Sequence, residues 1–264
     1  MSKENEVVEE DKASKISKPL KQSIAIFAML GSCAWTFENN FLNLFIDRTI
    51  TTDPLVITIT TAASAVMAAL TTLVVGTYLD KKGKRTPYMK WGYFVWGISI
   101  LLFALINVNG IQKLFNISHT SAIITASVLV IIWDAAMTFL GSSCNDAAYN
   151  MWLTDNSNPK NRSRVEGFSS FFSSLGSYFL YILDFVGGFI IFNLIGKKSL
   201  GTTGLIGMTF NTYYDLSGNF IGTSLPQGYS GEYVVKFGYW WIFYLVLGLA
   251  VGLAAVFAHR KLKD

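Results

Sequence analysis

The sequence predicts an all-helical membrane protein with six transmembrane helices, and composition, run length and charge placement each predict it. Hydrophobic residues make up 52% of the chain and charged residues 14%. Soluble domains rarely carry so much apolar sequence in uninterrupted runs. A helix needs about 20 apolar residues to cross a bilayer core of about 30 Å. Six runs are long enough: 23–46, 56–78, 88–107, 121–150, 167–194 and 237–258. Unpaired backbone groups are so costly in lipid that each run is predicted to be helical.

The segments outside these runs divide the chain into a tail, a membrane domain and a long outer loop. Residues 1–22 mix Lys with acids and are predicted to be a disordered cytoplasmic tail rather than a signal peptide. Residues 23–260 form the membrane domain. Its polar, Gly- and Tyr-rich segment 196–236 is expected to be a surface insertion or an outer lid. Residues 261–264 begin a central cytoplasmic loop or end the chain.

The basic residues lie mainly on one side of the predicted membrane. The tail, the loop between the second and third runs, the loop between the fourth and fifth runs, and the C-terminus hold 16 of the 21 Lys and Arg. The opposite side holds Arg48, Lys113, Lys197, Lys198 and Lys236. The positive-inside rule therefore places both termini in the cytoplasm, in a multi-pass protein of the cell membrane.

The stretch GTYLDKKGKRTP (76–87) follows the second run and carries the pattern G-x-x-x-D-x-x-G-x-R at Gly76, Asp80, Gly83 and Arg85. It resembles motif A of the major facilitator superfamily, which lies in the same loop. Gly76 would let two helices approach closely, and Gly83 would permit a tight turn. The basic residues would engage neighbouring helix ends and lipid headgroups. We expect this motif to act in conformational switching.

A second stretch, NDAAYNMWLTDNSNPKNRSR (145–164), closes the fourth run. It is similar to the pattern of the glycoside–pentoside–hexuronide:cation symporters, in which an Asp or Asn precedes a small-small-Tyr segment, a Leu-Thr-Asp turn and a basic cluster. The matching residues are Asp146, Tyr149, Leu153, Thr154, Asp155, Arg162 and Arg164. The resemblance implies a substrate and cation site near Asp146 and a conformational role for the two arginines.

This resemblance implies one half of a major facilitator fold, built as a 3+3 inverted repeat. The implied activity is secondary transport of a sugar, a glycoside or another polar solute by alternating access. The family cavity lies between two halves, so the expected partners are the lipid bilayer, a small-molecule substrate, and a missing C-terminal half or a second copy. The sequence leaves open whether the chain is truncated, encoded by a split gene, or active as an oligomer.

Four acids lie in or near the runs, at Glu38, Asp134, Asp146 and Asp184, and no Lys or Arg lies in the core of any run. An acid in a membrane is by default a candidate functional residue. It is protonated, paired with a residue of another segment, or in contact with a cationic ligand. Hydrogen bonding to a neighbouring helix is the structural alternative.

Polar residues flank two of these acids on predicted helical faces. Trp35, Asn39 and Asn43 share four-residue spacing beside Glu38, and aromatic and amide groups on one wall suit a sugar; helix packing through amides is the alternative. The fourth run carries a comparable polar stripe that begins at Asp134. Its members are Asp134, Thr138, Gly141, Asn145 and Tyr149.

Asp146 lies about 120° round from Asp134, at about 100° per residue, which predicts different surroundings for the two acids. Ser142, Ser143 and Asn145 surround Asp146 with hydrogen-bonding groups. We expect Asp146 to cycle between protonated and ionised forms.

The chain departs from the symporter pattern in two places. Span two holds paired carboxylates in that family, but here Ala68 and Thr72 align with them, and Ser170 stands near the expected sugar-contacting Arg. These departures make sodium coupling of that type less favoured than proton coupling, and they count against a galactoside substrate.

Two alternatives to a sugar transporter follow from the same residues. Acids without bases favour a proton-coupled exporter of cationic compounds, and the missing half favours a non-transporting membrane partner or receptor. An enzyme is not expected, since no nucleophile–base pair appears. No cofactor, metal site or nucleic-acid partner is predicted: Cys33 and Cys144 are expected to pack in the spans, and His119 and His259 are far apart in the sequence.

Overall fold

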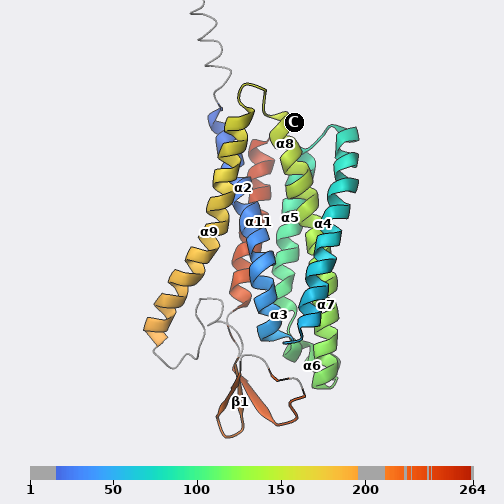
Figure 1. The fold of residues 1–264 in the computed structure, drawn as a ribbon, viewed down its shortest axis with the longest axis vertical. Helices are drawn as coiled ribbons and strands as arrows, with labels where there is room; N and C mark the ends of the chain where they lie inside the picture. The colour runs from blue at the N-terminus through green and yellow to red at the C-terminus, as the bar shows by residue number, and fades with distance from the viewer. Residues whose placement is uncertain are drawn as a thin grey trace, which may run out of the picture.

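The computed structural model describes residues 16–195, 212–222, 225–226, 228–236, 238 and 240–262, and this part of the chain is mostly helical (Figure 1). Its long helices run alternately in opposite directions. In chain order the α-helices are α2 (Lys18–Thr36), α3 (Asn43–Thr49), α4 (Pro54–Lys82), α5 (Thr86–Leu102), α6 (Val108–Phe115), α7 (His119–Gly141), α8 (Asn150–Asp155), α9 (Arg162–Ile195) and α11 (Trp241–Lys261). Three short segments of other helix types join them: η1 (Phe37–Leu42), η2 (Phe103–Leu105) and η3 (Ser142–Tyr149).

Each predicted run corresponds to a helix, or to helices joined end to end, with boundaries within five residues of those expected. Three described stretches are long and apolar enough to cross a bilayer: Pro54–Lys82, Thr86–Leu105 and His119–Asp155. Trp241–Phe257 is a shorter apolar helix. The first run is more polar than these because Glu38 and three asparagines interrupt it. The helical, apolar character of a membrane protein is therefore present, with three stretches that meet the length and hydropathy needed to span.

Local capping chemistry explains where the helices begin and end. α2 starts at Lys18, inside the segment predicted to be disordered, and Pro19 lies in its first turn, where a missing N–H costs nothing. The Asp53 side chain accepts a 2.9 Å hydrogen bond from the Leu55 N–H and caps α4. Gly83 ends α4 with φ of 66°, a left-handed conformation that glycine adopts without steric cost. The tight turn expected at Gly83 is therefore confirmed.

Apolar side chains cover much of the outside of the bundle, whereas several polar side chains are buried within it. Leu73 on α4 is 69% exposed, and Leu70 and Leu253 are also exposed. Glu38 and Asp134 are buried. An exterior of this kind is compatible with a lipid environment.

Glycines allow α5 and α11 to pack closely against each other. A Cβ placed on Gly97 would lie 2.6 Å from both the Gly248 carbonyl oxygen and the Gly252 nitrogen. A Cβ on Gly248 would lie 2.7 Å from the Gly97 carbonyl oxygen. Gly248 and Gly252 form a G-x-x-x-G pair in the sixth run, and Gly97 is the residue against which this pair packs.

We expect Gly97→Ala to destabilise the protein, because the new methyl group collides with backbone atoms that cannot rotate away. Overpacking of this kind costs about 1–3 kcal/mol, which lowers Tm by roughly 2–4 °C per kcal/mol in a chain of this size. Gly252→Ala is the matched control, since its Cβ would meet no atom within 4 Å. Thermal unfolding of the purified protein in detergent measures both variants. Equal Tm values for the two would contradict this packing.

The segment predicted as an outer loop contains a three-stranded antiparallel sheet, so the expectation of an all-helical chain is wrong here. Its order is β2 (Phe220–Gly222), β1 (Thr212–Asp215), β3 (Tyr233–Lys236). Tyr and β-branched residues favour strands. Gly218, with φ of 84°, lies in the β1–β2 turn, where the Asp215 carboxylate accepts a 2.8 Å bond from the Asn219 N–H. These strands are short, and β1 and β3 pair over a long sequence separation, so they leave no apolar run in the sequence. Residues 196–211 of the loop lie outside the described part.

Candidate functional site

Two π-helical segments determine which side chains of the first and fourth runs meet. η1 joins α2 to α3, and η3 joins α7 to α8. A π-helical turn bonds residue i to i+5 and so holds one more residue than an α-helical turn. At about 100° per residue, one extra residue rotates everything after it back by about 100°. Such segments are frequent at functional sites.

The rotation brings Asp134 and Asp146 to the same cavity, so the expectation that they face different surroundings is wrong. In a regular α-helix, the two would lie about 120° apart. The extra residue accommodated by η3 reduces this to about 20°, which places both carboxylates on one face. The same correction in η1 brings Asn43 within about 20° of Trp35, instead of about 80°.

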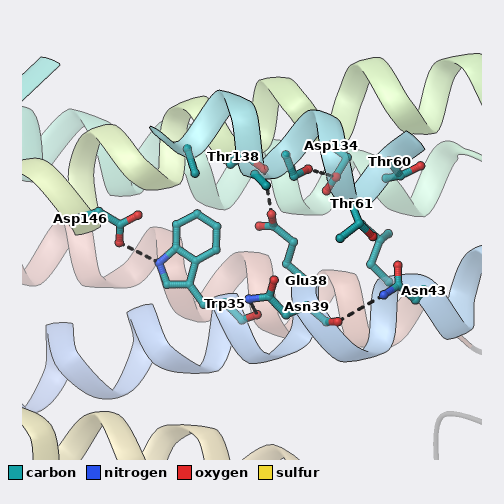
Figure 2. A pocket seen from close by; sticks show the side chains of 13 residues that line it. Trp35, Glu38, Asn39, Asn43, Thr60, Thr61, Asp134, Thr138 and Asp146 are labelled. Atoms are coloured by element: carbon teal, nitrogen blue, oxygen red, sulfur yellow. Dashed lines mark hydrogen bonds between the residues drawn. The ribbon is translucent and has the colours of Figure 1, made fainter. Parts of the chain in front are cut away.

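A cavity of about 350 Å³ lies between the first run, α4 and the α7–η3 helix. Figure 2 shows its acidic and amide side chains converging from these helices. Its lining residues are Trp35, Glu38, Asn39, Leu42, Asn43, Thr60, Thr61, Ser64, Ala65, Ala68, Asp134, Thr138 and Asp146. Trp35, Asn39 and Asn43 therefore line the same wall of the cavity, as their spacing predicts, and Glu38 lies on this wall too.

Glu38 and Asp134 are each held by one hydroxyl group from a neighbouring helix. The Thr138 hydroxyl donates a 2.8 Å hydrogen bond to Glu38 Oε1, and the Ser64 hydroxyl donates to Asp134 Oδ2. Glu38 is 6% exposed and Asp134 1% exposed. The second oxygen of each carboxyl group, Glu38 Oε2 and Asp134 Oδ1, is buried without a hydrogen-bond partner among the described residues. A buried carboxyl oxygen of this kind calls for a proton, a cation or a ligand donor.

Asp146 lies at the other end of the same cavity and is held differently (Figure 2). Its Oδ1 atom accepts hydrogen bonds from the Trp35 indole N–H and from the Asn145 amide, both at 3.1 Å. Asn145 in turn accepts a 2.6 Å bond from the Tyr93 hydroxyl. This network fixes the orientation of the Trp35 ring, which offers a flat apolar surface to a ligand.

The electrostatic character of the cavity is acidic. Three carboxyl groups line it, and none of its described lining residues is Lys, Arg or His. Ionised carboxylates are costly in a closed, water-poor space unless a positive charge compensates them. No group of three or more His, Cys, Asp or Glu in the described part of the chain is arranged to hold a metal ion. A proton or a cationic group of a solute would compensate the carboxylates.

Some predicted site residues lie elsewhere. Tyr149 is buried, and its hydroxyl contacts the Ser169 hydroxyl at 2.9 Å, which ties η3 to α9. Ser143 lines a separate groove between α4 and α5. Asp184 belongs to α9, but its side chain lies outside the described residues.

The sequence reasoning missed the contribution of α4. Thr60, Thr61 and Ser64 line the cavity, and Thr60 is buried. Thr60, Ser64 and Ala68 form a stripe of small residues at four-residue spacing, and all three line the cavity. That spacing was the available signal.

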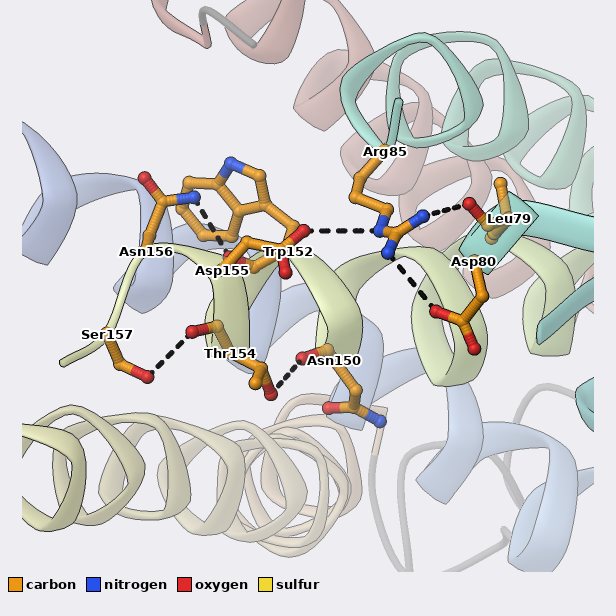
Figure 3. Close-up of polar contacts among 9 residues, drawn as sticks. All are labelled: Leu79, Asp80, Arg85, Asn150, Trp152, Thr154, Asp155, Asn156 and Ser157. Atoms are coloured by element: carbon orange, nitrogen blue, oxygen red, sulfur yellow. Dashed lines mark hydrogen bonds and ion pairs between the residues drawn. The ribbon is translucent and has the colours of Figure 1, made fainter. Parts of the chain in front are cut away.

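Arg85 connects the stretch 76–87 with the stretch 145–164 (Figure 3). Its guanidinium group lies 3.2 Å from Asp80 Oδ1 and 3.2 Å from Asp155 Oδ2. It also donates to the Leu79 carbonyl at the end of α4. The expectation that the basic residues engage helix ends is therefore confirmed for Arg85, and Asp155 is an additional partner from the second stretch.

The other members of the two motifs lie around this contact. A Cβ on Gly76 would lie 3.3 Å from the Met151 side chain, so α4 comes close to α8 here. Arg162 pairs with Glu166 on its own helix at 2.8 Å, and Arg164 is exposed at the start of α9. The two arginines therefore take no part in the Arg85 contacts drawn in Figure 3.

Comparison of the chain with protein-family models, with curated proteins and with solved structures gives no significant match.

Proposed function

We propose that this chain is one six-span half of a secondary active transporter, which moves a polar organic solute across the cell membrane by alternating access coupled to protons. The observation that carries the proposal is the acidic cavity: three carboxyl groups, amides and hydroxyls face one space inside an apolar bundle. Such intramembrane acids are the usual components of substrate and proton pathways. The second half of the site comes from a C-terminal half or a second copy.

The packing order of the helices supports a 3+3 inverted repeat. In such a repeat the first three spans, α2, α4 and α5, correspond in order to the last three, α7, α9 and α11. The contact between α2 and α9 then corresponds to the contact between α7 and α4. The contact between α5 and α11 corresponds to itself. These three pairs have the most extensive long-helix contacts in the described chain. α11 against α2 and α5 against α7 form a further related pair. The π-helical segments also occur in the corresponding first and fourth spans, so both halves of the repeat carry an irregular turn beside the cavity.

The distribution of charge supports an orientation with both termini in the cytoplasm. The loop after α4 and the start of α9 lie at one end of the bundle, and the three-stranded sheet lies at the other (Figure 1). The basic loop residues of the sequence thus gather at one end. At this end, the Arg85 contacts with Asp80 and Asp155 tie α4 to α8 and would have to rearrange when the bundle rocks.

The proposed cycle follows from the carboxyl groups. When the cavity is open to water, hydration tolerates the negative charges; when it closes, each charge must be neutralised by a proton or by the solute. Glu38 and Asp134 each have an oxygen free to take a proton or accept a solute hydrogen bond. Trp35 provides a stacking surface, and Asn39, Asn43 and the α4 hydroxyls provide donors and acceptors for a sugar or glycoside.

Organic cations are a second candidate substrate class, and the protein would export them in exchange for protons. The specific observation is that the three carboxyl groups have no basic residue among the described lining residues. An ammonium group would neutralise the same charge as a proton, so the two would compete for the cavity.

The test is solute uptake into proteoliposomes that contain the purified protein, with and without an imposed pH gradient. The panel contains monosaccharides, glycosides and organic ammonium compounds, and binding is followed by the fluorescence difference between the wild type and Trp35→Phe. Gradient-dependent accumulation of a sugar or glycoside, abolished by a protonophore, is the expected result. Accumulation of ammonium compounds alone would favour the second class. Binding without uptake or exchange of any solute would contradict transport and favour a receptor.

A further inference from the structure

A second cavity lies on the outside of the bundle, separate from the acidic site. It is a groove of about 700 Å³ between α4 and α5. In the described structure both helices contact α7 and η3, whereas they make few contacts with each other, so α7 forms the floor of the groove. Its lining residues are Val74, Val75, Tyr78, Lys82, Lys84, Pro87, Tyr88, Trp91, Gly92, Phe139, Leu140 and Ser143.

The groove changes character along its length. Val74 and Lys82 lie eight residues apart on α4, which at a rise of about 1.5 Å per residue is about 12 Å. The apolar part is formed by side chains such as Val74, Trp91 and Phe139, which are 68%, 68% and 45% exposed. The other end carries Lys82 and Lys84, and no described lining residue is acidic.

Aromatic residues mark the boundary between the two parts. The Lys82 ammonium lies 5.4 Å from the centre of the Tyr78 ring, and the Tyr78 and Tyr88 rings meet edge to face at 6.0 Å. Tyrosines between an apolar surface and a basic one are typical of the membrane–water interface. The nearby acids Asp80 and Asp155 each lie 3.2 Å from Arg85, and the ion pairs of the described residues join neither of them to Lys82 or Lys84.

We infer that this groove binds an anionic phospholipid, with its phosphate at Lys82 and Lys84 and the start of an acyl chain along Trp91 and Phe139. The groove is complementary to an anionic amphiphile. Its cationic part lies at the basic end of the bundle, and its apolar part runs along the proposed span. A zwitterionic lipid fits the apolar part equally well but gains less from the two lysines. A basic residue close to an anionic surface favours binding by about fivefold.

Trp91 provides a direct test, because brominated acyl chains quench an indole that they contact. The purified full-length protein is reconstituted in phosphatidylcholine vesicles that contain brominated phosphatidylglycerol or brominated phosphatidylcholine at equal mole fraction. The difference in quenching between the wild type and Trp91→Phe gives the contribution of Trp91. We expect brominated phosphatidylglycerol to compete for the groove at least about fivefold better than brominated phosphatidylcholine.

The charge variants decide whether Lys82 and Lys84 cause the preference. Lys82→Gln with Lys84→Gln should reduce the difference between the lipids to within about twofold, with Tm unchanged. Lys81→Gln with Lys90→Gln removes the same charge from neighbouring residues that do not line the groove, and should retain the preference. Equal quenching by both lipids in the wild type, or loss of the preference only in the control pair, would overturn the inference. Neither readout depends on transport, so this result and the proposed function stand or fall separately.

Discussion

Glu38→Gln is expected to abolish accumulation of solute driven by a pH gradient while preserving exchange of solute across the membrane. One proton moved per solute allows up to about tenfold accumulation for each unit of pH difference, since tenfold corresponds to about 1.4 kcal/mol. The glutamine side chain can still accept the hydrogen bond from Thr138, but it carries no exchangeable charge. The accumulation ratio should therefore fall to about one.

Asp47→Asn is the matched control for this variant. Asp47 lies in the helix that continues from Glu38, pairs with Arg48 at 3.1 Å and does not line the cavity. Its replacement removes one negative charge from the same region and should leave accumulation unchanged. The measurement is uptake into proteoliposomes with an imposed pH gradient, beside counterflow without one. Wild-type accumulation in Glu38→Gln would exclude Glu38 from coupling and leave Asp134 and Asp146 to be tested.

Asp146 should respond differently to removal of its charge and to removal of its hydrogen-bonding group. Asp146→Asn keeps an oxygen that can accept the bonds from Trp35 and Asn145, so exchange should continue while gradient-driven accumulation is lost. Asp146→Ala also releases the Trp35 ring, and should impair accumulation and exchange together. We expect its substrate affinity to fall by about tenfold or more, because charge-assisted hydrogen bonds contribute about 1.5–3 kcal/mol.

A double-mutant cycle checks this reason. Trp35→Phe keeps an aromatic ring but lacks the N–H that donates to Asp146. If the bond positions the ring, Asp146→Ala and Trp35→Phe together should cost less in binding free energy than the sum of the single changes. Strict additivity would show that Asp146 acts independently of Trp35. Undiminished accumulation by Asp146→Asn would exclude Asp146 as a coupling residue.

The sequence by itself determined the positions of the helices and the local geometry of one site wall. Apolar runs and caps are local signals, so the helix boundaries agree with prediction within five residues, including the turn at Gly83. Four-residue spacing likewise placed Trp35, Asn39 and Asn43 on one cavity wall. The close packing at Gly248 also has a local signal, because its four-residue spacing to Gly252 presents small residues to a neighbouring helix.

Only the tertiary structure decided how the acids are held and which of them meet. The π-helical segment η3 alters the rotation that relates Asp134 to Asp146, and a count at constant angle cannot include it. Glu38 bonds to a hydroxyl 100 residues away, and Asp134 to one 70 residues away, so no local pattern contains either pair. The contact between Arg85 and Asp155 and the pairing of the short strands are also long-range. Burial of these groups depends on which helix faces are adjacent, and that is a property of the packed bundle rather than of any single run.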